Sequence, residues 1–394
     1  MLDSIAIAET GLKGYESALQ TISNNTANMN TPGFKGSSTE FSDLAFGNGE
    51  GSLGGDETSF GQPGLGLKTL GTTIDFSQGE FQSTSNPLDL AVNGNGFFIT
   101  KDTAGDIHYT KDGQFKFDDK GMLVSQTTGE QVMARDSGGA LTPVTIAGLN
   151  TSLPKATTSV VFNGNLSSTA TTDTINAVTV IDSSGTSHSL QVTLTPVTGS
   201  SGSWTVTLLD GATTVGTATL KFTGNNVTPG SGTLSYTYTP AGGSAMPLTL
   251  DFSGNVTSTD QGGSSSLAVA SQDGYAMGTI TGETFDATGT LSLAYSNNQT
   301  VKGQQLALAQ FTSIDQVEAV GNSQFKAKGD AWQTGVAGSA TYGSIESSEI
   351  EGSNVDLSRE FSNLVIMQRG YQASSQIVST ASDMMTALFG MMPK

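Results

Sequence analysis

The two ends of this 394-residue chain carry similar periodic patterns of apolar residues, and these patterns constrain the fold more than any other feature. Near the N-terminus, apolar or small residues recur at alternating intervals of four and three, as in a coiled coil. They are Ile5, Ala8, Leu12, Tyr15, Leu19, Ile22, Thr26 and Met29. The spacing predicts a helix that ends near Asn30, because Pro32 disfavours helical geometry at Thr31 and Gly33 follows.

The C-terminal segment has a stripe of residues that lie seven apart. They are Leu357, Leu364, Tyr371, Val378 and Met385, with Phe361, Met367, Ala381 and Leu388 beside or between them. Ser353, Asn354 and Asp356 offer capping oxygens before this helix, and Gly390 and Pro393 are expected to end it.

Both predicted helices are long for a globular domain of this size. Each has roughly 25 to 35 residues, or about 40 to 50 Å at 1.5 Å per residue. This length favours a coiled coil, and the alternative is that both helices pack on a β core. The free energy gained by burying one apolar stripe is smaller than the entropic cost of ordering such a helix. We therefore expect each helix to need several neighbours, most simply other copies, and to be largely disordered in the free monomer.

The middle of the chain is typical of β structure rich in turns. Glycine accounts for 50 of the 394 residues, and alternating apolar residues persist between the glycines. Residues 46–71 predict a Gly-rich linker. Asp112-Gly113 and Thr128-Gly129 then separate the strands of a predicted β-meander. Residues 146–270, in which Thr, Ser, Gly and Val dominate, predict a separate all-β module.

Together these segments predict a mainly β fold of discontinuous, nested domains with a terminal α-helical coiled coil. The expected parts are a helical domain (residues 1–30 with 353–394) and a linker (residues 31–71). They are followed by a first β domain (residues 72–145 with 271–352) and an inserted outer β domain (residues 146–270).

Charge and targeting signals exclude several classes of protein. With 35 acidic and 16 basic residues the net charge is -19, so neither a nucleic-acid binder nor a membrane-surface protein is favoured. The chain has no cysteine. Asp3 and Glu9 lie where a cleavable signal peptide has its basic and apolar regions. Because no apolar run approaches the ~20 residues of a membrane span, secretion would have to use another route.

No residue pattern predicts catalysis, a cofactor or a metal site. His108 and His188 lie 80 residues apart in different predicted domains, and solvated strand positions explain them best. Asp118 and Asp182 lack the ligand series of a calcium loop and are interpreted as turn residues. A β-sandwich hydrolase is the enzyme alternative, but no spacing distinguishes its available carboxylates from surface acids. These are Glu80, Asp89, Glu283 and Asp286.

Four ordered blocks of residues resemble the family of bacterial flagellar rod and hook proteins. The first comprises Asn24, Asn25, Ala27, Asn28, Thr31, Gly33, Phe34 and Lys35. The second comprises Leu88, Asp89, Ala91, Gly94, Gly96, Phe97 and Phe98, and the third is the hairpin of Tyr109, Thr110, Asp112, Gly113 and Phe115. The fourth is EGSNVDLSREFSNLVIMQRGYQAS at residues 351–374. The resemblance covers residues 1–145 and 270–394, with Lys13, Tyr15 and Glu16 where small residues are usual in the family.

The resemblance implies a structural polymer rather than an enzyme. The inserted module, the Gly-rich stretch and the length are similar to those of the family's hook members, so the implied function is a curved helical tube acting as a universal joint between rod and filament. The helices would line an inner tube, the first β domain would form a middle layer and residues 146–270 would face outward. The implied location is the extracellular flagellum, reached without a cleaved signal.

The implied partners are other copies of the chain, the distal rod, hook cap and hook–filament junction proteins, and the flagellar export apparatus, with no cofactor. We predict a self-assembly interface on the two terminal helices. Its residues are Ile5, Leu12, Tyr15, Leu19, Ile22, Asn24, Asn25, Asn28, Leu357, Phe361, Leu364, Gln368, Tyr371, Val378 and Met385. A fraying helix end is the alternative for the three asparagines. The alternatives for the whole chain are a distal rod protein and a β-rich surface adhesin.

Overall fold

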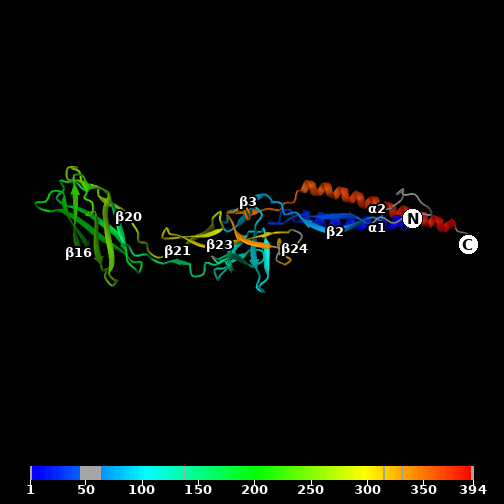
Figure 1. Cartoon of the computed structure of the whole chain (residues 1–394), viewed down its shortest axis with the longest axis horizontal. Helices are drawn as coiled ribbons and strands as arrows, with labels where there is room; N and C mark the ends of the chain where they lie inside the picture. Colours follow the sequence, from blue (N-terminus) through cyan, green and yellow to red (C-terminus); the bar gives the residue numbers. More distant parts are fainter. Residues whose placement is uncertain (1, 45–63, 137, 314–315, 330–331, 392–394) are drawn as a thin grey trace, which may run out of the picture. The chain divides into compact units, whose positions relative to one another are not determined.

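A computed structural model describes residues 2–44, 64–136, 138–313, 316–329 and 332–391 of the chain. Its fold is mainly β with one long helix at each end, as expected (Figure 1). The chain divides into two compact units. Unit 1 comprises Met1–Ala147, Glu283–Ser292 and Lys302–Lys394, and unit 2 comprises Gly148–Gly282 and Leu293–Val301.

The predicted terminal helices are both present in unit 1. The N-terminal helix α1 spans Leu2–Ala27 and is followed by turns at residues 28–30, close to the predicted end. The C-terminal helix α2 spans Leu357–Met391. Asp356 caps α2, because its Oδ1 accepts the backbone N–H groups of Ser358 at 2.8 Å and Arg359 at 3.2 Å. Gly390 lies inside α2 rather than ending it, and Pro393 lies outside the described residues.

Part of the predicted linker forms a β-hairpin, which corrects the expectation for residues 31–71. Strands β1 (Ser37–Asp43) and β2 (Leu67–Ile74) pair in antiparallel register, with a bulge beside Glu40. The hairpin is held by α1: the Thr21 and Thr39 hydroxyls lie 2.9 Å apart. Contact with α1 therefore accompanies strand pairing in part of the predicted linker. Residues 45–63 of the predicted linker lie outside the described residues.

The β part of unit 1 is built on short strands. In chain order they are β3 (Phe81–Ser83), β4 (Leu90–Asn93), β5 (Phe97–Lys101), β6 (Ile107–Thr110), β7 (Phe115–Phe117), β8 (Leu123–Ser125), β9 (Gln131–Arg135), β10 (Leu141–Pro143), β23 (Thr300–Phe311), β24 (Val317–Gly321), β25 (Gln324–Ala327), β26 (Trp332–Val336), β27 (Ser344–Ser347) and β28 (Glu349–Glu351). The predicted meander holds for β7–β8–β9, whereas β6 pairs with β5 and β25. An aromatic cluster that includes Phe76, Phe97 and Phe311 fills the centre.

Five hairpin turns share one construction, an aspartate followed three residues later by a glycine with positive φ. The aspartates are Asp102, Asp118, Asp136, Asp182 and Asp286. In each turn the glycine N–H donates to the aspartate backbone carbonyl, and the carboxylate accepts further N–H groups of the turn. This is the three-residue hairpin in which an αL residue forms a bulge. The turn interpretation of Asp118 and Asp182 is thereby confirmed.

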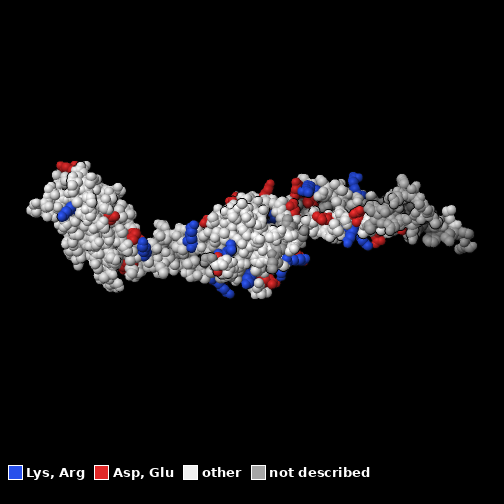
Figure 2. All heavy atoms as spheres, in the orientation of Figure 1, with Lys and Arg blue, Asp and Glu red and all other residues white. Residues whose placement is uncertain are grey.

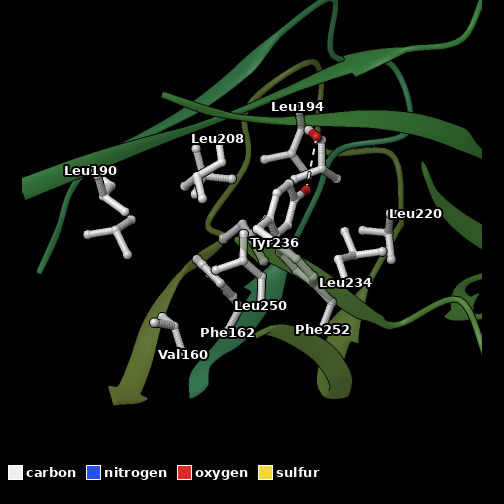
Figure 3. Packing of buried hydrophobic residues seen from close by; sticks show 14 of the residues in the cluster. Val160, Phe162, Leu190, Leu194, Leu208, Leu220, Leu234, Tyr236, Leu250 and Phe252 are labelled. Carbon is white, nitrogen blue, oxygen red and sulfur yellow. Dashed lines mark hydrogen bonds between the residues drawn. The ribbon is translucent and has the colours of Figure 1, made fainter. Parts of the chain in front are cut away.

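Unit 2 is a β-sandwich-like body with its own core. Its strands are β11 (Thr151–Ser152), β12 (Ser159–Asn165), β13 (Asp173–Ile181), β14 (Ser187–Pro196), β15 (Ser203–Asp210), β16 (Thr213–Thr223), β17 (Asn226–Val227), β18 (Thr233–Tyr238), β19 (Met246–Thr257) and β20 (Ala268–Gln272). Figure 3 shows the packed interior, where Tyr236 donates its hydroxyl to the Val206 carbonyl at 3.0 Å. Phe162 and Phe252 stack with ring centroids 4.4 Å apart.

The boundary of the inserted module differs from the expected residues 146–270. Strands β21 (Gly278–Phe285) and β22 (Thr290–Tyr295) each contain residues of both units, and residues 271–282 group with unit 2. Asp273 explains part of the shift, because its carboxylate accepts hydrogen bonds from Thr158 and Ser159. The paired segments that enter and leave the module therefore fold as part of it.

Candidate self-assembly interface

The helices α1 and α2 pack side by side in antiparallel directions (Figure 1). The ring of Tyr15 lies against Gly370, where an added Cβ would be 2.5 Å from the tyrosine Cζ. Nearer the other end of α1, Asn25 Nδ2 donates to Glu360 Oε1 at 3.3 Å. The residue numbers of each pair add to 385, so one register runs along the helices. The first neighbour of each helix is therefore the other end of the same chain.

Small residues on α1 allow this close approach. The fully buried positions of the helix are Ala8, Gly11, Gly14, Ala18, Ile22 and Asn25. An added Cβ on Gly11 would lie 2.9 Å from the Ser374 hydroxyl, which shows how closely the helices cross there. Gly14 serves the hairpin instead, because its position is covered by Leu67 and Phe41. The α1 helix thus contacts α2 and the β1–β2 hairpin along two different stripes.

The interface residues predicted on α1 occupy three environments. Ile22 and Asn25 are buried, and Asn24 is exposed. Ile5, Leu12, Tyr15 and Leu19 are partly buried beside the contact with α2, and Asn28 is partly buried in the turn that follows α1.

Four of the predicted residues on α2 are partly buried; they are Leu357, Leu364, Val378 and Met385. Phe361 and Tyr371 are 53% and 41% exposed, and Gln368 is also exposed. On a helix with 3.6 residues per turn, Phe361, Leu364 and Tyr371 lie to one side of the α1-facing stripe. The same calculation places Ile5, Leu12 and Leu19 on that side of the pair.

A second apolar stripe on α2 was not predicted from the sequence. Its members are Ile366, Ile377, Met384, Leu388 and Met391, whose exposed fractions are 61%, 50%, 49%, 52% and 81%. Their spacings of eleven, seven, four and three residues place them on one helical stripe, about a quarter turn from the side facing α1. The heptad of Ile377, Met384 and Met391 was the available signal, but the neighbouring stripe obscured it.

The last two turns of α2 have no partner on α1. In the antiparallel register, residue 383 falls opposite Leu2, where α1 begins, so residues 384–391 extend beyond it. This segment carries Met384, Leu388 and Met391, three of the exposed apolar side chains.

Asn25 is not available as a surface contact. Only 2% of the residue is exposed, and its side chain makes a paired hydrogen bond with the backbone of Ser37. Asn25 Nδ2 donates to the Ser37 carbonyl at 2.7 Å, and the Ser37 N–H donates to Asn25 Oδ1 at 3.0 Å. Asn28 donates to the Asn24 carbonyl at 2.9 Å. The asparagines of the first block therefore join α1 to the hairpin and form its C-terminal turn, rather than fray.

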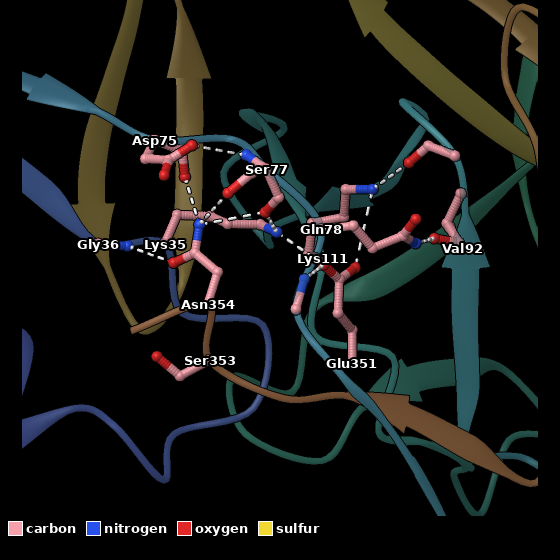
Figure 4. Close-up of polar contacts among 12 residues, drawn as sticks. Lys35, Gly36, Asp75, Ser77, Gln78, Val92, Lys111, Glu351, Ser353 and Asn354 are labelled. Carbon is pink, nitrogen blue, oxygen red and sulfur yellow. Dashed lines mark hydrogen bonds and ion pairs between the residues drawn. The ribbon is translucent and has the colours of Figure 1, made fainter. Parts of the chain in front are cut away.

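A buried ion pair joins the first and fourth blocks (Figure 4). Lys35 Nζ lies 2.6 Å from Glu351 Oε1, and neither side chain is exposed. Lys35 also donates to the Ser77 carbonyl at 2.7 Å, and the Gly79 N–H donates to the same Glu351 oxygen at 2.9 Å. Because these partners are buried, loss of either would remove the closest opposite charge from a group in the interior.

Lys111 lies beside this pair. Its Nζ is 3.8 Å from Glu351 Oε2 and donates to the Gly94 carbonyl at 2.7 Å. It also lies 5.1 Å from the centre of the Phe97 ring. Burial lowers the pKa of Lys111 to about 8, and the Glu351 carboxylate opposes this shift only in part. Lys111, which lies within the segment of the third block without being one of its residues, therefore contributes to the same polar junction.

Asn354 completes the junction between α2 and the hairpin. Its Oδ1 accepts the Gly36 N–H at 2.8 Å, and its Nδ2 donates to the carbonyls of Asp75 and Ser77 at 2.8 and 3.1 Å (Figure 4). Gly33 allows the chain to pass close by: its φ is +66°, and an added Cβ would lie 2.4 Å from a backbone nitrogen. Residues of these blocks thus form the polar junction from which α1 and α2 extend.

The two histidines are paired with carboxylates, which corrects the expectation of solvated strand positions. His108 Nδ1 lies 2.9 Å from Glu130 Oε1, and His188 Nε2 lies 2.9 Å from Asp182 Oδ2. Ser184 also binds Asp182, but through its own hydroxyl and not through the histidine. This arrangement lacks the serine-to-histidine hydrogen bond of a nucleophilic triad.

The described residues form neither a metal cluster nor a membrane-spanning helix. No group of three or more histidine, aspartate or glutamate side chains there is arranged to hold a metal ion. Neither α1 nor the described part of α2 combines the length and apolarity needed to cross a membrane.

Three protein families match separate parts of the chain. The family described as "Flagellar hook protein FlgE/F/G D1 domain" matches residues 91–167. "Flagellar basal body rod FlgEFG protein C-terminal" matches residues 346–391, and "Flagella basal body rod protein" matches residues 5–35. These matches include the segments that form the helix pair and the polar junction.

Similar proteins cover nearly the whole chain. Flagellar hook protein FlgE of Salmonella typhimurium is 31% identical over 98% of this chain and 99% of its own length. The protein of the same name from Escherichia coli K12 is 29% identical over 97% and 98%. The crystal structure of Helicobacter pylori flagellar hook protein FlgE2 is 14% identical, with a TM-score of 0.45, and covers 62% of this chain and 93% of that one. On the full-length sequence similarity, the chain belongs to the flagellar hook protein FlgE family.

Proposed function

We propose that this chain is the structural subunit of a bacterial flagellar hook, which self-assembles into a curved helical tube and passes torque from the rod to the filament as a universal joint. The observation that carries the proposal is the apolar surface of the helix pair. Phe361, Ile366 and Ile377 are each at least half exposed, although they lie on a regular helix that could have carried polar residues there. A surface of this kind needs further copies of the chain to cover it.

Helical growth requires contacts that do not close on themselves. Identical subunits that meet through two different surfaces form an open helix when the rotation between them does not close a ring. We assign the inner tube to residues 1–30 with 353–394, the middle layer to 72–145 with 271–352, and the outer layer to the inserted module. We propose the same self-assembly residues on the terminal helices as before. Asn25 would contribute indirectly, because its side chain binds the backbone of Ser37.

The outer layer is suited to movement between neighbours. Unit 2 contains two lysines, no arginine and six aspartates, so it contributes only -4 of the net charge of -19. Charged atoms are sparse on the face of unit 2 in Figure 2. Surfaces with few charges impose few fixed ion pairs, so neighbouring outer domains would slide with small energy differences as the tube bends.

Partners and location follow from the same proposal. Beyond itself, the chain would contact distal rod, hook cap and hook–filament junction proteins, and would leave the cell unfolded through the flagellar export apparatus. It would lie in the extracellular part of the flagellum without a cleaved signal peptide. No catalytic activity is proposed, because a structural polymer accounts for the features described above.

A distal rod protein is the second candidate, since two of the matching families are named for rod proteins. Electron microscopy of material assembled from the purified chain separates the two. A hollow tube that adopts curved forms supports the hook, and a short straight tube supports the rod. A chain that stays monomeric under all assembly conditions would contradict both, and glycan or host-protein binding by it would favour an adhesin.

A further inference from the structure

The helix pair carries apolar residues on two opposite sides. We define face A as Ile5, Leu12 and Leu19 of α1 with Phe361, Leu364 and Tyr371 of α2. We define face B as Ile366, Ile377, Met384, Leu388 and Met391 of α2. On a helix with 3.6 residues per turn, the α2 members of the two faces lie on either side of the stripe that packs against α1. One chain therefore presents two unlike apolar surfaces.

The two faces also differ in their surroundings. Arg359, at the N-terminal end of the face B stripe, lines a cavity together with Ser37 and Thr39 of β1. This cavity places the β1–β2 hairpin on the same side of the helix pair as face B. Among the described residues, face A has no hairpin beside it, and it is formed by both helices. A surface of two helices and a surface of one helix beside a hairpin are not interchangeable in packing.

Unpaired charges beside the two faces differ in net sign. Glu16 is exposed on α1 next to Tyr15, on the face A side, and forms no ion pair within the described part of the chain. On the face B side, Arg359 and Arg369 of α2 outnumber the exposed Asp3 of α1, and none of the three forms an ion pair with a described residue. The exposed Lys13–Glu9 pair of α1 shows that charges on these helices do pair where a partner is in reach.

We propose that face A of one chain packs on face B of a second copy, so that helix pairs join head to tail. This inference rests on the proposed function and specifies the contact that it requires. The occupant of each face is a second copy because the two faces have complementary flanking charges and are both apolar at helical spacing. An A-to-B contact leaves one face of each kind free at the ends, which permits continued growth.

Mixing two blocked variants tests the head-to-tail contact. Phe361→Asp blocks face A, and Ile377→Asp blocks face B, in side chains that are 53% and 50% exposed and so tolerate a polar replacement. Each full-length variant alone should remain monomeric, with its critical concentration for assembly raised roughly tenfold or more. Mixed together, they should form a discrete dimer, because one intact face A and one intact face B remain. Analytical ultracentrifugation resolves the 40.4 kDa chain from its dimer.

Other outcomes of the mixing experiment contradict the inference. Dimers of one variant alone would show that like faces pair, and a mixture that stays monomeric would show that A and B do not meet. The unmodified chain is measured in parallel: if it also fails to assemble, the proposed function is wrong, whereas assembly of the unmodified chain confines the failure to the face assignment. Circular dichroism compares the helicity of each variant with that of the unmodified chain below the concentration for assembly, and Phe361→Ser with Ile377→Ser replaces any pair whose helicity is lower.

Discussion

The ring of Tyr15 on α1 packs directly on Gly370 of α2, where an added Cβ would lie 2.5 Å from Cζ and 2.7 Å from Cε1. The absence of a side chain at Gly370 makes room for the Tyr15 ring. The cost of glycine inside a helix, about 1 kcal/mol relative to alanine, is offset here by the burial of an aromatic ring.

This contact predicts an unusual response to a helix-favouring substitution. Gly370→Ala should lower the thermal stability of the helix pair, because a methyl group 2.5 Å from the Tyr15 ring costs about 1 to 3 kcal/mol in overpacking. Gly390→Ala in the same helix is the matched control, because its added Cβ meets nothing within 4 Å. It should leave the stability unchanged or raise it. Circular dichroism at 222 nm measures both, and Tyr15→Ala should restore much of the loss in Gly370→Ala.

A second prediction concerns the buried pair of Lys35 and Glu351. Lys35→Met should lower the free energy of unfolding of unit 1 by about 3 to 5 kcal/mol, because Glu351 loses its closest cation. Lys13→Met removes the exposed partner of Glu9 and should have a much smaller effect, because solvent screens this pair. Urea titration followed by Trp332 fluorescence in a Trp204→Phe background reports on unit 1. Equal effects of the two lysine substitutions would contradict the assigned burial.

The terminal helices and the aspartate turns could be predicted because their signals are local. The heptad of Leu357, Leu364 and Tyr371 and the spacing of Asp182 and Gly185 each lie within one element. The β1–β2 hairpin could not be predicted in this way. Its ordering depends on α1, for example on the hydrogen bond from the Leu67 N–H to the Thr10 hydroxyl.

The pairing of polar residues far apart in the chain could not be predicted from the sequence either. Lys35 belongs to the first block and Glu351 begins the fourth, 316 residues later, and no periodicity relates them. The resemblance identified both segments without giving the reason for their residues. In the structure, Lys35, Asn354 and Glu351 make the polar contacts that join the two segments beside the helix pair.

The pKa of Lys111 predicts a rise in stability at alkaline pH. The folded pKa of about 8 is below the usual value near 10.4, so the unfolded chain binds more protons between these pH values. The cost of burying the cation is therefore full below pH 8 and decreases as the pH rises toward 10.4. Between pH 7.5 and 9.5, unit 1 should gain on the order of 2 kcal/mol from this group.

The alkaline gain is measured as a difference between two chains. Urea titrations of the parent and of Lys111→Met at both pH values isolate the contribution of the lysine, since all other groups titrate in both. A parent chain that gains no more stability than Lys111→Met would show that the buried lysine keeps its ordinary pKa.

The predicted interface is tested by Leu364→Asp, which puts a carboxylate on a partly buried position of α2. Assembly should fail, because a charge without a partner would enter a packed helix layer. Leu364→Met is the control, since it conserves volume and should assemble normally. Trp204 fluorescence should remain native in both, because its core belongs to unit 2. Normal assembly by Leu364→Asp would show that this stripe takes no part in the polymer.

The unequal lengths of α1 and α2 predict where the helix pair is least stable before assembly. Residues 384–391 have no α1 segment opposite them, and Met391 is 81% exposed. An unpaired helix end is held by little beyond its own hydrogen bonds and should fray. In dilute monomer, the backbone amides of this segment should therefore exchange with solvent fastest within α2, and circular dichroism should show incomplete helicity. After assembly the same amides should become protected, because neighbouring copies cover Met384 and Leu388. Full protection of residues 384–391 in a dilute monomer would show that the lone chain already satisfies this end, and it would remove the need for other copies on which the polymer proposal depends.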